Sequence, residues 1–336
     1  MSAKMLGLAL AAFSAATLPA LAQDAFKPAI VYDLGGKFDK SFNEGVYTGA
    51  ERFRTETGTA YRDFEPKNDA QREQALRRFA RDGFSPIVAV GFSQQSAVEK
   101  VATEFPQTKF AIIDSVIEKP NVESITFQEH EGSYLVGLLA AMASKTGKVG
   151  FIGGMDIPLI RKFACGYAQG AKSVKPDAEI IVNMTGTTGA AWNDPVKGGE
   201  LAKSQIERGA DVIYHAAGGT GIGVLRAAAD AGKLGIGVDS NQNMLHPGKV
   251  LTSRLKRVDN ATFQAFTQAK AGAFKAGHQV LGLKEDGVGW ALDEHNKPLI
   301  TDAMKAAADK AEQSIESGAV KVHDYMADNK CPALGG

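Results

Sequence analysis

The chain has 336 residues, and its 38 Lys and Arg side chains equal its 38 Asp and Glu side chains, for a formal net charge of +0 at pH 7. This balance gives no electrostatic footprint for nucleic acid or an anionic membrane, so we expect neither as a partner. Hydrophobic residues make up 44% of the chain. At roughly 100–200 residues per domain, the length predicts two domains.

The N-terminus has the layout of a secretory signal peptide. Lys4 supplies a positive charge, residues 5–18 are apolar or small, and the small-x-small triplet 20–22 precedes a polar stretch. An N-terminal membrane anchor is the alternative, but a spanning helix needs roughly 20 apolar residues and this core is shorter. We therefore expect residues 1–22 to be removed by cleavage after Ala22, and the mature protein to reside in a periplasm.

Short apolar runs alternate with amphipathic segments along the rest of the chain. The runs lack period-2 alternation and are rich in Ile and Val, which is typical of strands buried on both faces of a parallel sheet. They lie at 29–32, 87–90, 110–113, 124–127, 148–152, 179–182, 211–214 and 235–238. Helical patterns lie at 71–81, 95–104, 131–144, 198–207, 223–231, 260–275 and 302–317. Repeated βαβ units predict an α/β fold with doubly wound parallel sheets.

Two segments of the chain resemble each other. In each, an apolar strand leads into glycine, a helix follows, and the next strand ends in Asp-Ser, at 114–115 in one and at 239–240 in the other. We therefore expect two homologous lobes, each with an aspartate at the carboxyl end of a strand. Open parallel sheets bind ligands at that end, so two such lobes facing each other predict a ligand cleft.

We place the first lobe at residues 24–127 plus 249–282 and the second at residues 128–248 plus 283–336. In this arrangement the chain returns to the first lobe through residues 250–253 and finishes on the second lobe with its last helix. A hinge of crossover strands joins the lobes, and we expect ligand binding to close them.

The segment 33–43 follows the first strand and carries carboxylates, an amide, a hydroxyl and two aromatic rings at the start of a helix. Its glycines suggest a phosphate loop, but the spacing is not G-x-G-x-x-G, and Asp33 and Asp39 would repel phosphate. A capped helix with Asp39 or Ser41 as N-cap is the structural alternative. Capping alone does not require the aromatic residue and amide that follow, so we favour a ligand-binding loop.

The motif D-x-G-G-x-x-D-x-S-F-N of this segment resembles the signature of the basic membrane protein family, the substrate-binding proteins of purine-nucleoside importers. Further motifs of the resemblance lie at 110–114, 150–155, 192–195, 215–221 and 238–239. The resemblance implies the type I periplasmic-binding-protein fold, in which a hinge joins two lobes around the ligand. It also implies a receptor without enzymatic activity that delivers a purine nucleoside to an ABC permease in the inner membrane. We expect this receptor to be a monomer without a cofactor.

For the base, the resemblance implies aromatic walls at Phe42 and Trp192 and edge-reading groups at Asn43 and Asp114. Stacking on an aromatic ring contributes about 1–3 kcal/mol per base. A 6-oxopurine offers an N1–H donor that Asp114 can accept, whereas the amide of Asn43 both donates and accepts. A core position for Phe42, a surface position for Trp192 and helix capping by Asp114 are the structural alternatives. The family commonly has Phe in place of Trp192, and many members carry a lipid-modified cysteine that this chain lacks.

For the ribose, the resemblance implies contacts from Gly218, Asp239 and Lys256. Vicinal hydroxyls donate to an ionised carboxylate such as Asp239, while Lys256 donates to a ribose oxygen and balances the charge of Asp239. Asp33 and Met155 complete the expected ligand site.

Other functions require features that do not stand out in the sequence. The six histidines include no i, i+4 pair, and no Ser-His-Asp, Cys-His or metal-ligand constellation is evident, so we expect neither a catalytic nor a metal site. An exported nucleoside hydrolase would need clustered catalytic carboxylates. A sugar or autoinducer receptor on the same fold stays open, because aromatic rings also stack on sugars. A transcriptional repressor shares the fold, but the signal peptide and the missing helix-turn-helix argue against it.

The only two cysteines are Cys165 and Cys331. An even count in an oxidising compartment predicts that they form a disulfide, which would fasten the C-terminal tail to the second lobe.

We expect His130 and His215 to be structural groups at strand ends.

Overall fold

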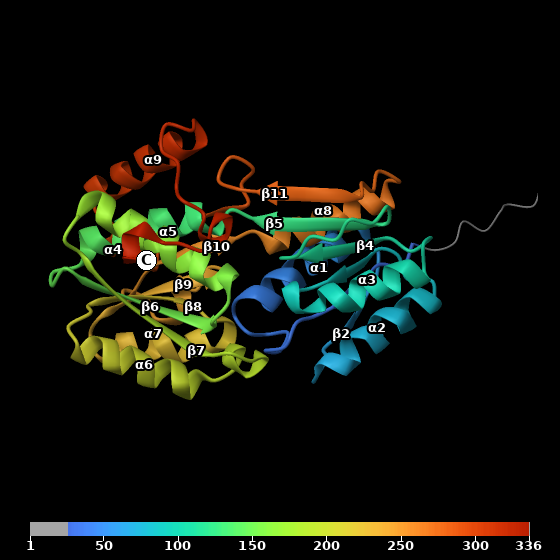
Figure 1. The fold of residues 1–336 in the computed structure, drawn as a ribbon, viewed down its shortest axis with the longest axis horizontal. Coiled ribbons are helices and arrows are strands. Elements are labelled where there is room, and N and C mark those ends of the chain that lie inside the picture. The colour runs from blue at the N-terminus through green and yellow to red at the C-terminus, as the bar shows by residue number, and fades with distance from the viewer. Residues whose placement is uncertain (1–25, 336) are drawn as a thin grey trace, which may run out of the picture.

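The computed structural model describes residues 26–335, and the expected signal peptide at 1–22 lies outside them. The described residues form two lobes that lie side by side, each built on a six-stranded sheet with helices on both faces (Figure 1). None of the helices in residues 26–335 is long and apolar enough to cross a membrane.

The first lobe contains a sheet whose paired strands all run parallel. Its strands are β1 (Ala29–Val31), β2 (Arg62–Phe64), β3 (Ile87–Ala89), β4 (Phe110–Ile113), β5 (Val122–Phe127) and β11 (Gly277–Leu281). They are arranged in the order β11-β5-β4-β3-β1-β2. Its helices are α1 (Phe42–Thr57), α2 (Asp69–Arg81), α3 (Gln95–Glu104) and α8 (Val258–Lys270).

The second lobe repeats this plan with one antiparallel edge strand. Its strands are β6 (Lys148–Met155), β7 (Glu179–Gly186), β8 (Val212–Ala216), β9 (Leu234–Asp239), β10 (Val250–Lys256) and β12 (Val288–Trp290). They are arranged in the order β12-β10-β9-β8-β6-β7. Its helices are α4 (Glu129–Ala143), α5 (Pro158–Val174), α6 (Pro195–Glu207), α7 (Gly221–Asp230) and α9 (Asp302–Glu316).

The eight apolar runs in the sequence all form strands, and most are buried from both sides; the run 179–182 lies in the edge strand β7, where only Ile181 is buried. In β1, for example, Ile30 packs with the cluster that includes α1 and α8, whereas Val31 packs with the cluster that includes α2 and α3. The predicted helices are confirmed to within three residues at their ends, except that α8 ends at Lys270 and not at 275. The strands β2, β11 and β12 were not predicted, since they are short and lie at or near sheet edges.

The two sheets correspond strand for strand, with β1, β3, β4 and β5 of the first matching β6, β8, β9 and β10 of the second in position. The internal repeat in the sequence is therefore a repeat of structure. Asp114 directly follows β4 and Asp239 is the last residue of β9, so the two aspartates occupy equivalent strand ends. Both have left-handed backbones, with φ of 68° and 63° respectively.

The expectation that the chain returns to the first lobe at residues 250–253 is wrong. These residues belong to β10, which pairs with β9 inside the second sheet, and the return begins only after Lys256. The chain passes between the lobes at three places, namely from β5 into α4, from β10 into α8 and from β11 towards β12. These three crossovers are the hinge expected from the sequence.

The helices α4 and α5 pack closely because glycines face the neighbouring backbone. A Cβ atom on Gly137 would overlap the carbonyl of Tyr167, and one on Gly166 would overlap the backbone of His130. This close contact fixes α5 against the start of α4, where the chain enters the second lobe.

The C-terminal tail follows α9 and lies against α5 (red in Figure 1). Cys331 of the tail and Cys165 of α5 form a disulfide, which confirms the pairing predicted from the sequence. His323 adds to this attachment, because its backbone N–H donates to the side-chain oxygen of Gln169 on α5 at 2.8 Å.

Candidate functional site

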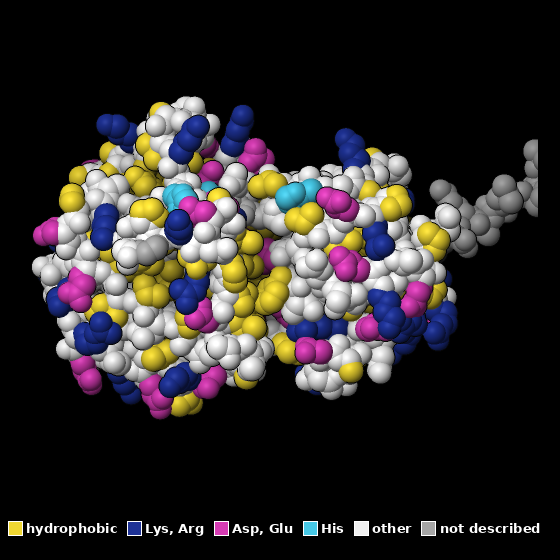
Figure 2. All heavy atoms as spheres, in the orientation of Figure 1, with side chains coloured by type: hydrophobic (Ala, Val, Ile, Leu, Met, Phe, Trp, Pro, Cys, Tyr) yellow, Lys and Arg dark blue, Asp and Glu magenta, His cyan; other side chains and the backbone are white. Residues whose placement is uncertain are grey.

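A cavity between the lobes contains about 560 Å³ of space that protein atoms do not fill, part of it open to solvent. The first lobe lines it with Asp33, Leu34, Asp39, Phe42, Asn43, Gly91, Phe92 and Asp114. The second lobe lines it with Leu159, Ile160, Phe163, Trp192, Ala216, Gly218, Val238, Asp239 and Lys256. Hydrophobic side chains also gather at the surface where the lobes meet (Figure 2).

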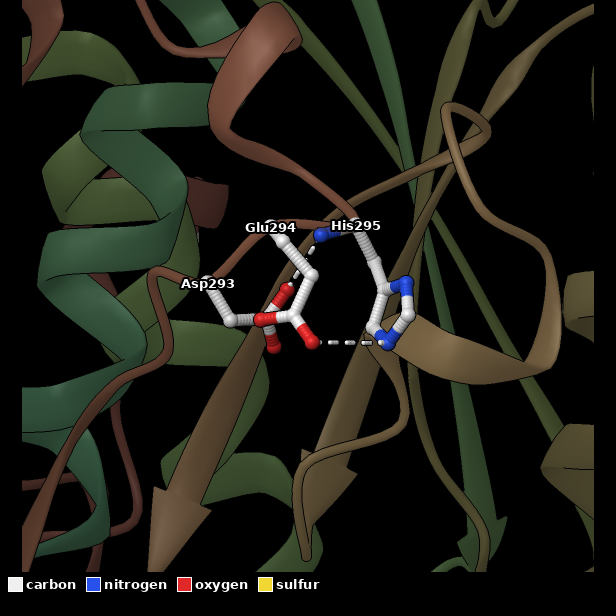
Figure 3. Close-up of side chains that lie close together, drawn as sticks. All are labelled: Asp293, Glu294 and His295. Carbon is white, nitrogen blue, oxygen red and sulfur yellow. Dashed lines mark hydrogen bonds and ion pairs between the residues drawn. The ribbon is translucent and has the colours of Figure 1, made fainter.

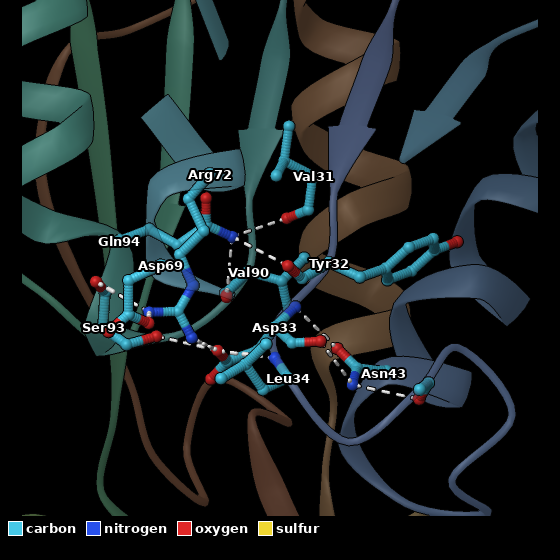
Figure 4. Close-up of polar contacts among 11 residues, drawn as sticks. Val31, Tyr32, Asp33, Leu34, Asn43, Asp69, Arg72, Val90, Ser93 and Gln94 are labelled. Carbon is cyan, nitrogen blue, oxygen red and sulfur yellow. Dashed lines mark hydrogen bonds and ion pairs between the residues drawn. The ribbon is translucent and has the colours of Figure 1, made fainter. Parts of the chain in front are cut away.

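Asp33 lies just beyond β1 and is held there by a buried arginine. Its Oδ1 accepts hydrogen bonds from the Arg72 guanidinium at 2.7 Å, the Ser93 hydroxyl at 2.7 Å and the backbone N–H of Leu34 at 2.8 Å (Figure 4). Burial raises the pKa of Asp33, and the charge of Arg72 opposes this shift. Since no donor of the described residues reaches Oδ2, this oxygen can accept a hydrogen bond from a ligand.

Ser41 occupies the N-cap position of α1, as one interpretation of the sequence predicted, but the side chain of Asp39 makes the capping hydrogen bonds. Its carboxylate accepts hydrogen bonds from the backbone N–H groups of Ser41, Asn43 and Glu44 at 2.8, 3.1 and 3.1 Å. These are the groups that a helix start leaves without partners. Burial nevertheless raises the pKa of Asp39 to about 7. Because Asp39 also lines the cavity, capping and ligand binding are compatible in this loop.

Asn43 ties the loop together from the first turn of α1. Its Oδ1 accepts a hydrogen bond from the backbone N–H of Asp33 at 3.1 Å, and its Nδ2 donates to the carbonyl of Gly36 at 3.1 Å (Figure 4). The amide is almost fully buried and borders the cavity. The hydrogen bonds of Asn43 therefore fix the position of Asp33.

Asp114 and Lys256 form an ion pair between the lobes. The ammonium of Lys256 lies 2.7 Å from each carboxylate oxygen of Asp114 and 3.0 Å from Oε1 of Glu129. Burial raises the pKa of Asp114 to about 6. Burial would also raise the pKa of Glu129, but the charges of Lys256 and Lys162 outweigh it and lower that pKa to about 2. Of the two carboxyls that share Lys256, Asp114 is therefore the one whose pKa lies closer to neutral pH.

Asp239 has different partners from those expected. The sequence predicted that Lys256 balances its charge, but Lys256 pairs with Asp114 and Glu129. The cation paired with Asp239 is Arg254, whose fully buried guanidinium lies 3.8 Å from Oδ1. Oδ2 accepts a hydrogen bond from the Ser41 hydroxyl of the first lobe at 2.7 Å. The pairing register of β9 and β10 explains this arrangement. Leu255 is opposite Asp239, and Lys256 lies one residue further along β10.

Aromatic rings from both lobes form the apolar part of the cavity, with Phe42 and Phe92 on the first and Phe163 and Trp192 on the second. The indole of Trp192 lies over Gly154, where any Cβ atom would overlap it. The Lys256 ammonium lies 5.1 Å from the ring centre of Phe42 and 5.8 Å from that of Phe163. The cavity thus combines flat aromatic surfaces with charged strand ends, an arrangement suited to a flat ligand that carries hydrogen-bond donors.

Eight of the nine residues predicted for the site line the cavity, and Met155 does not. Met155 ends β6 beside Gly154, which accommodates the indole instead. Nine lining residues were not predicted as ligand contacts, among them Phe92 and three residues of α5. Phe92 follows the strand-end Gly91, a position that favours a ligand contact. The α5 residues carry no such signal, because an apolar helix face has the same sequence pattern whether it covers a core or a ligand.

One group of potential metal ligands occurs in residues 26–335, namely Asp293, Glu294 and His295 (Figure 3). These residues are consecutive and exposed or half-exposed, and they are not part of the cavity lining. The Asp293 carboxylate accepts hydrogen bonds from Asn241 and Asn243 and from the backbone N–H of His295. It therefore stabilises a turn.

Comparison with known proteins places the cavity in context. A family model described as "ABC transporter substrate-binding protein PnrA-like" matches residues 26–324. The chain is 35% identical over 319 residues to an "ABC transporter nucleoside-binding protein BmpA" of Lactococcus lactis and 37% identical over 322 residues to a "CD4+ T-cell-stimulating antigen" of Listeria monocytogenes, covering 88% of both chains in each case.

A solved structure extends the match to the fold. An ABC transporter solute-binding protein from Aeropyrum pernix superposes with a TM-score of 0.81 at 30% identity, covering 88% of this chain and 92% of that one. The type I periplasmic-binding-protein fold expected from the sequence is therefore confirmed.

Proposed function

Because the chain belongs to the Bmp family of PnrA-like ABC transporter substrate-binding proteins, we propose that it binds a purine nucleoside in the cavity between its lobes. The observation that carries this proposal is the pairing of aromatic rings with carboxylates at equivalent strand ends of both lobes. A nucleoside has both a flat base and vicinal hydroxyl donors, so it satisfies both kinds of group at once.

In the proposed complex the base lies between Phe42 and Trp192, with Asn43 and Asp114 at its edge. Stacking on each ring contributes about 1–3 kcal/mol. The raised pKa of Asp114, about 6, leaves its carboxylate ionised at neutral pH, as acceptance of an N1–H requires. An ionised acceptor favours guanosine and inosine over adenosine, because adenine presents an acceptor at the same position.

The ribose is proposed to meet Gly218, Asp239 and Lys256. Asp239 retains lone pairs beyond those used by Ser41 and Arg254, so it can accept from ribose hydroxyls. Lys256 can donate to the ligand from its position beside Asp114. Binding would then exchange part of this ion pair for hydrogen bonds to the nucleoside.

We further propose that the protein acts in the periplasm as a monomer, after cleavage behind Ala22, and delivers its ligand to an inner-membrane permease. Each lobe supplies part of the cavity lining, so the ligand gains its full set of contacts only when the lobes are closed. Small-angle scattering with and without guanosine tests closure, and no compaction at saturation contradicts it.

Titration calorimetry tests the site. We expect the wild-type protein to bind guanosine and inosine and to bind free ribose far more weakly. Asp239→Ala should nearly abolish binding of every nucleoside, because hydrogen bonds to a charged acceptor contribute about 1.5–3 kcal/mol each. Asp114→Ala should change the base preference instead. Wild-type affinity in Asp239→Ala, or ribose bound as tightly as guanosine, would refute the nucleoside proposal.

The same protein preparation tests the receptor against the alternative of a hydrolase. Incubation with guanosine for several hours should leave the nucleoside intact. Release of free guanine with turnover would show an enzyme instead. Mass spectrometry of the ligand extracted from purified protein identifies the natural nucleoside independently of these assays.

A further inference from the structure

Ser41 is a buried first-lobe residue that donates to a second-lobe carboxylate. It lies at the N-cap of α1, and its side chain is fully excluded from solvent. Its Oγ is 2.7 Å from Oδ2 of Asp239 and 3.3 Å from the carbonyl oxygen of Val238. A hydroxyl carries one proton, and the shorter contact is to the charged acceptor, so Asp239 receives the stronger hydrogen bond.

Little else orients the Asp239 carboxylate. Among residues 26–335, the Ser41 hydroxyl is the only hydrogen-bond donor that reaches it. Arg254 lies 3.8 Å from the other oxygen, a distance that stabilises the charge without fixing its direction. The left-handed backbone of Asp239 sets where the side chain starts, and the rotation of its carboxylate depends on Ser41.

We propose that Ser41 is a positioning residue, which aims the Asp239 carboxylate at the ribose only when the lobes are closed. This inference rests on the proposed function, in which Asp239 accepts from the ribose. Since Ser41 and Asp239 belong to different lobes, opening the hinge separates donor from acceptor. The closed state then presents a fixed carboxylate, whereas the open state presents one free to rotate. Closure and ribose recognition are therefore coupled through one hydrogen bond.

A second hydrogen bond between the same segments provides a control, because it joins the lobes without orienting the Asp239 carboxylate. The hydroxyl of Ser240 donates to the backbone carbonyl of Ser41 at 2.7 Å, also across the lobe interface. Neither atom of this bond belongs to a side chain that lines the cavity. Ser240→Ala therefore removes one hydrogen bond between the lobes and leaves the Ser41–Asp239 contact in place, so it is the matched control for Ser41→Ala.

A double-mutant cycle with inosine as the ligand tests the proposal. Calorimetry should show Ser41→Ala weakening inosine binding about tenfold or more, as expected for loss of a hydrogen bond that orients a charged acceptor. In an Asp239→Ala background, whose residual weak binding is measured at high inosine concentration, the same change should lower the affinity less than twofold, because nothing remains to be positioned. Ser240→Ala should lower the affinity for inosine less than threefold. Hypoxanthine lacks the ribose. Its affinity, measured by displacement, should fall less than twofold in Ser41→Ala.

The outcomes distinguish this inference from the function on which it rests. If Asp239→Ala leaves inosine affinity unchanged, the nucleoside proposal fails and this inference fails with it. If Asp239→Ala weakens binding but the effect of Ser41→Ala is the same in both backgrounds, only the inference is overturned. Equal losses in Ser41→Ala and Ser240→Ala would likewise show a general latch and overturn the positioning role.

Discussion

The ammonium of Lys256 lies 2.7 Å from the carboxylate of Asp114, which joins the last residue of a second-lobe strand to the residue after a first-lobe strand. Glu129 accepts the same cation at 3.0 Å and is the first residue of α4. Lys256 and Glu129 thus lie at two of the three crossovers between the lobes. Asp114 and Lys256 also line the cavity, so this buried cluster connects the hinge to the cavity.

Lys256→Met should destabilise the protein by about 3–5 kcal/mol, because Asp114 loses the cation paired with it and Glu129 keeps only Lys162, at 3.0 Å. The side chain of Lys256 is 2% exposed and that of Glu129 is 1% exposed, so water cannot reach the carboxylates to solvate them after the ammonium is removed. Urea unfolding at pH 7.5 measures the change. Lys203→Met is the control, since Lys203 is exposed and makes no ion pair in the described structure. A loss below 1 kcal/mol in Lys256→Met would contradict the role of this cluster.

Loss of the disulfide should lower the free energy of unfolding by ~2–5 kcal/mol, because Cys165 and Cys331 close a long loop of the unfolded chain. Cys331→Ser and wild-type protein in dithiothreitol should show the same shift in urea midpoint. Dithiothreitol should have no further effect on Cys331→Ser. Two free thiols in non-reduced, denatured wild-type protein would show that the bond is absent.

Most strands of the fold were predictable from the sequence, because strands buried on both faces must be apolar throughout and form recognisable Ile- and Val-rich runs; the edge strands β2, β11 and β12 lack that pattern. The equivalent positions of Asp114 and Asp239 were visible for the same reason, as each ends such a run. The placement of β10 was not predictable, since Val250–Lys256 has the same strand character in either sheet and only its pairing with β9 decides.

The candidate site divides in a similar way. Loop residues such as Asp33 and Asn43 were recognisable because polar groups cluster after a strand. Phe163 was not, since its position on α5 suits core packing equally well. The partner of Lys256 was also hidden, because the ion pair with Asp114 joins residues far apart in sequence and exists only when the two lobes lie together.

Glu123→Gln should stabilise the protein at pH 8. Glu123 is buried in β5, and burial raises its pKa to about 7. A carboxyl whose folded pKa exceeds its unfolded value stabilises the protein below the unfolded pKa and loses that contribution as pH rises through the folded pKa. Above pH 7 the wild type therefore bears the cost of a buried charge, which Gln avoids, and the gain should be about 2 kcal/mol.

The gain from Glu123→Gln should disappear near pH 4.5, where the folded wild type holds a proton on Glu123. Urea unfolding at pH 8 and pH 4.5 measures both values. Glu118→Gln serves as the control, because Glu118 is exposed and its substitution should change stability at neither pH. An equal effect of Glu123→Gln at the two pH values would contradict the role of burial.

Gly154→Ala should weaken nucleoside binding by about tenfold or more. A Cβ atom at this position would overlap the six-membered ring of Trp192, so the indole must move from its place in the cavity wall. Gly289→Ala is the control, since no atom lies within 4 Å of a Cβ atom built there. Calorimetry with guanosine measures the affinity, and tryptophan fluorescence reports the displaced indole. Wild-type affinity in Gly154→Ala would show that the position of Trp192 does not matter for binding.

The choice between inosine and adenosine should depend on pH through Asp114. Burial raises the pKa of this carboxyl to about 6, so it is ionised at pH 7.5 and mostly protonated at pH 5. The ionised form accepts the N1–H of inosine, whereas the protonated form donates to the N1 acceptor of adenosine. The ratio of inosine to adenosine affinity follows the ratio of ionised to protonated Asp114, which changes tenfold per pH unit, so it should fall by up to about 300-fold between pH 7.5 and pH 5.

Calorimetry with both nucleosides at pH 7.5, 6 and 5 measures this ratio. Asp114→Asn removes the titrating group while keeping a side chain of similar size, so its ratio should stay constant over the same range. Other titrating carboxyls, such as Asp39 with its pKa of about 7, remain in Asp114→Asn, so this variant also reports any contribution that they make to the ratio. A wild-type ratio that is the same at pH 7.5 and pH 5 would show that Asp114 does not read the base edge.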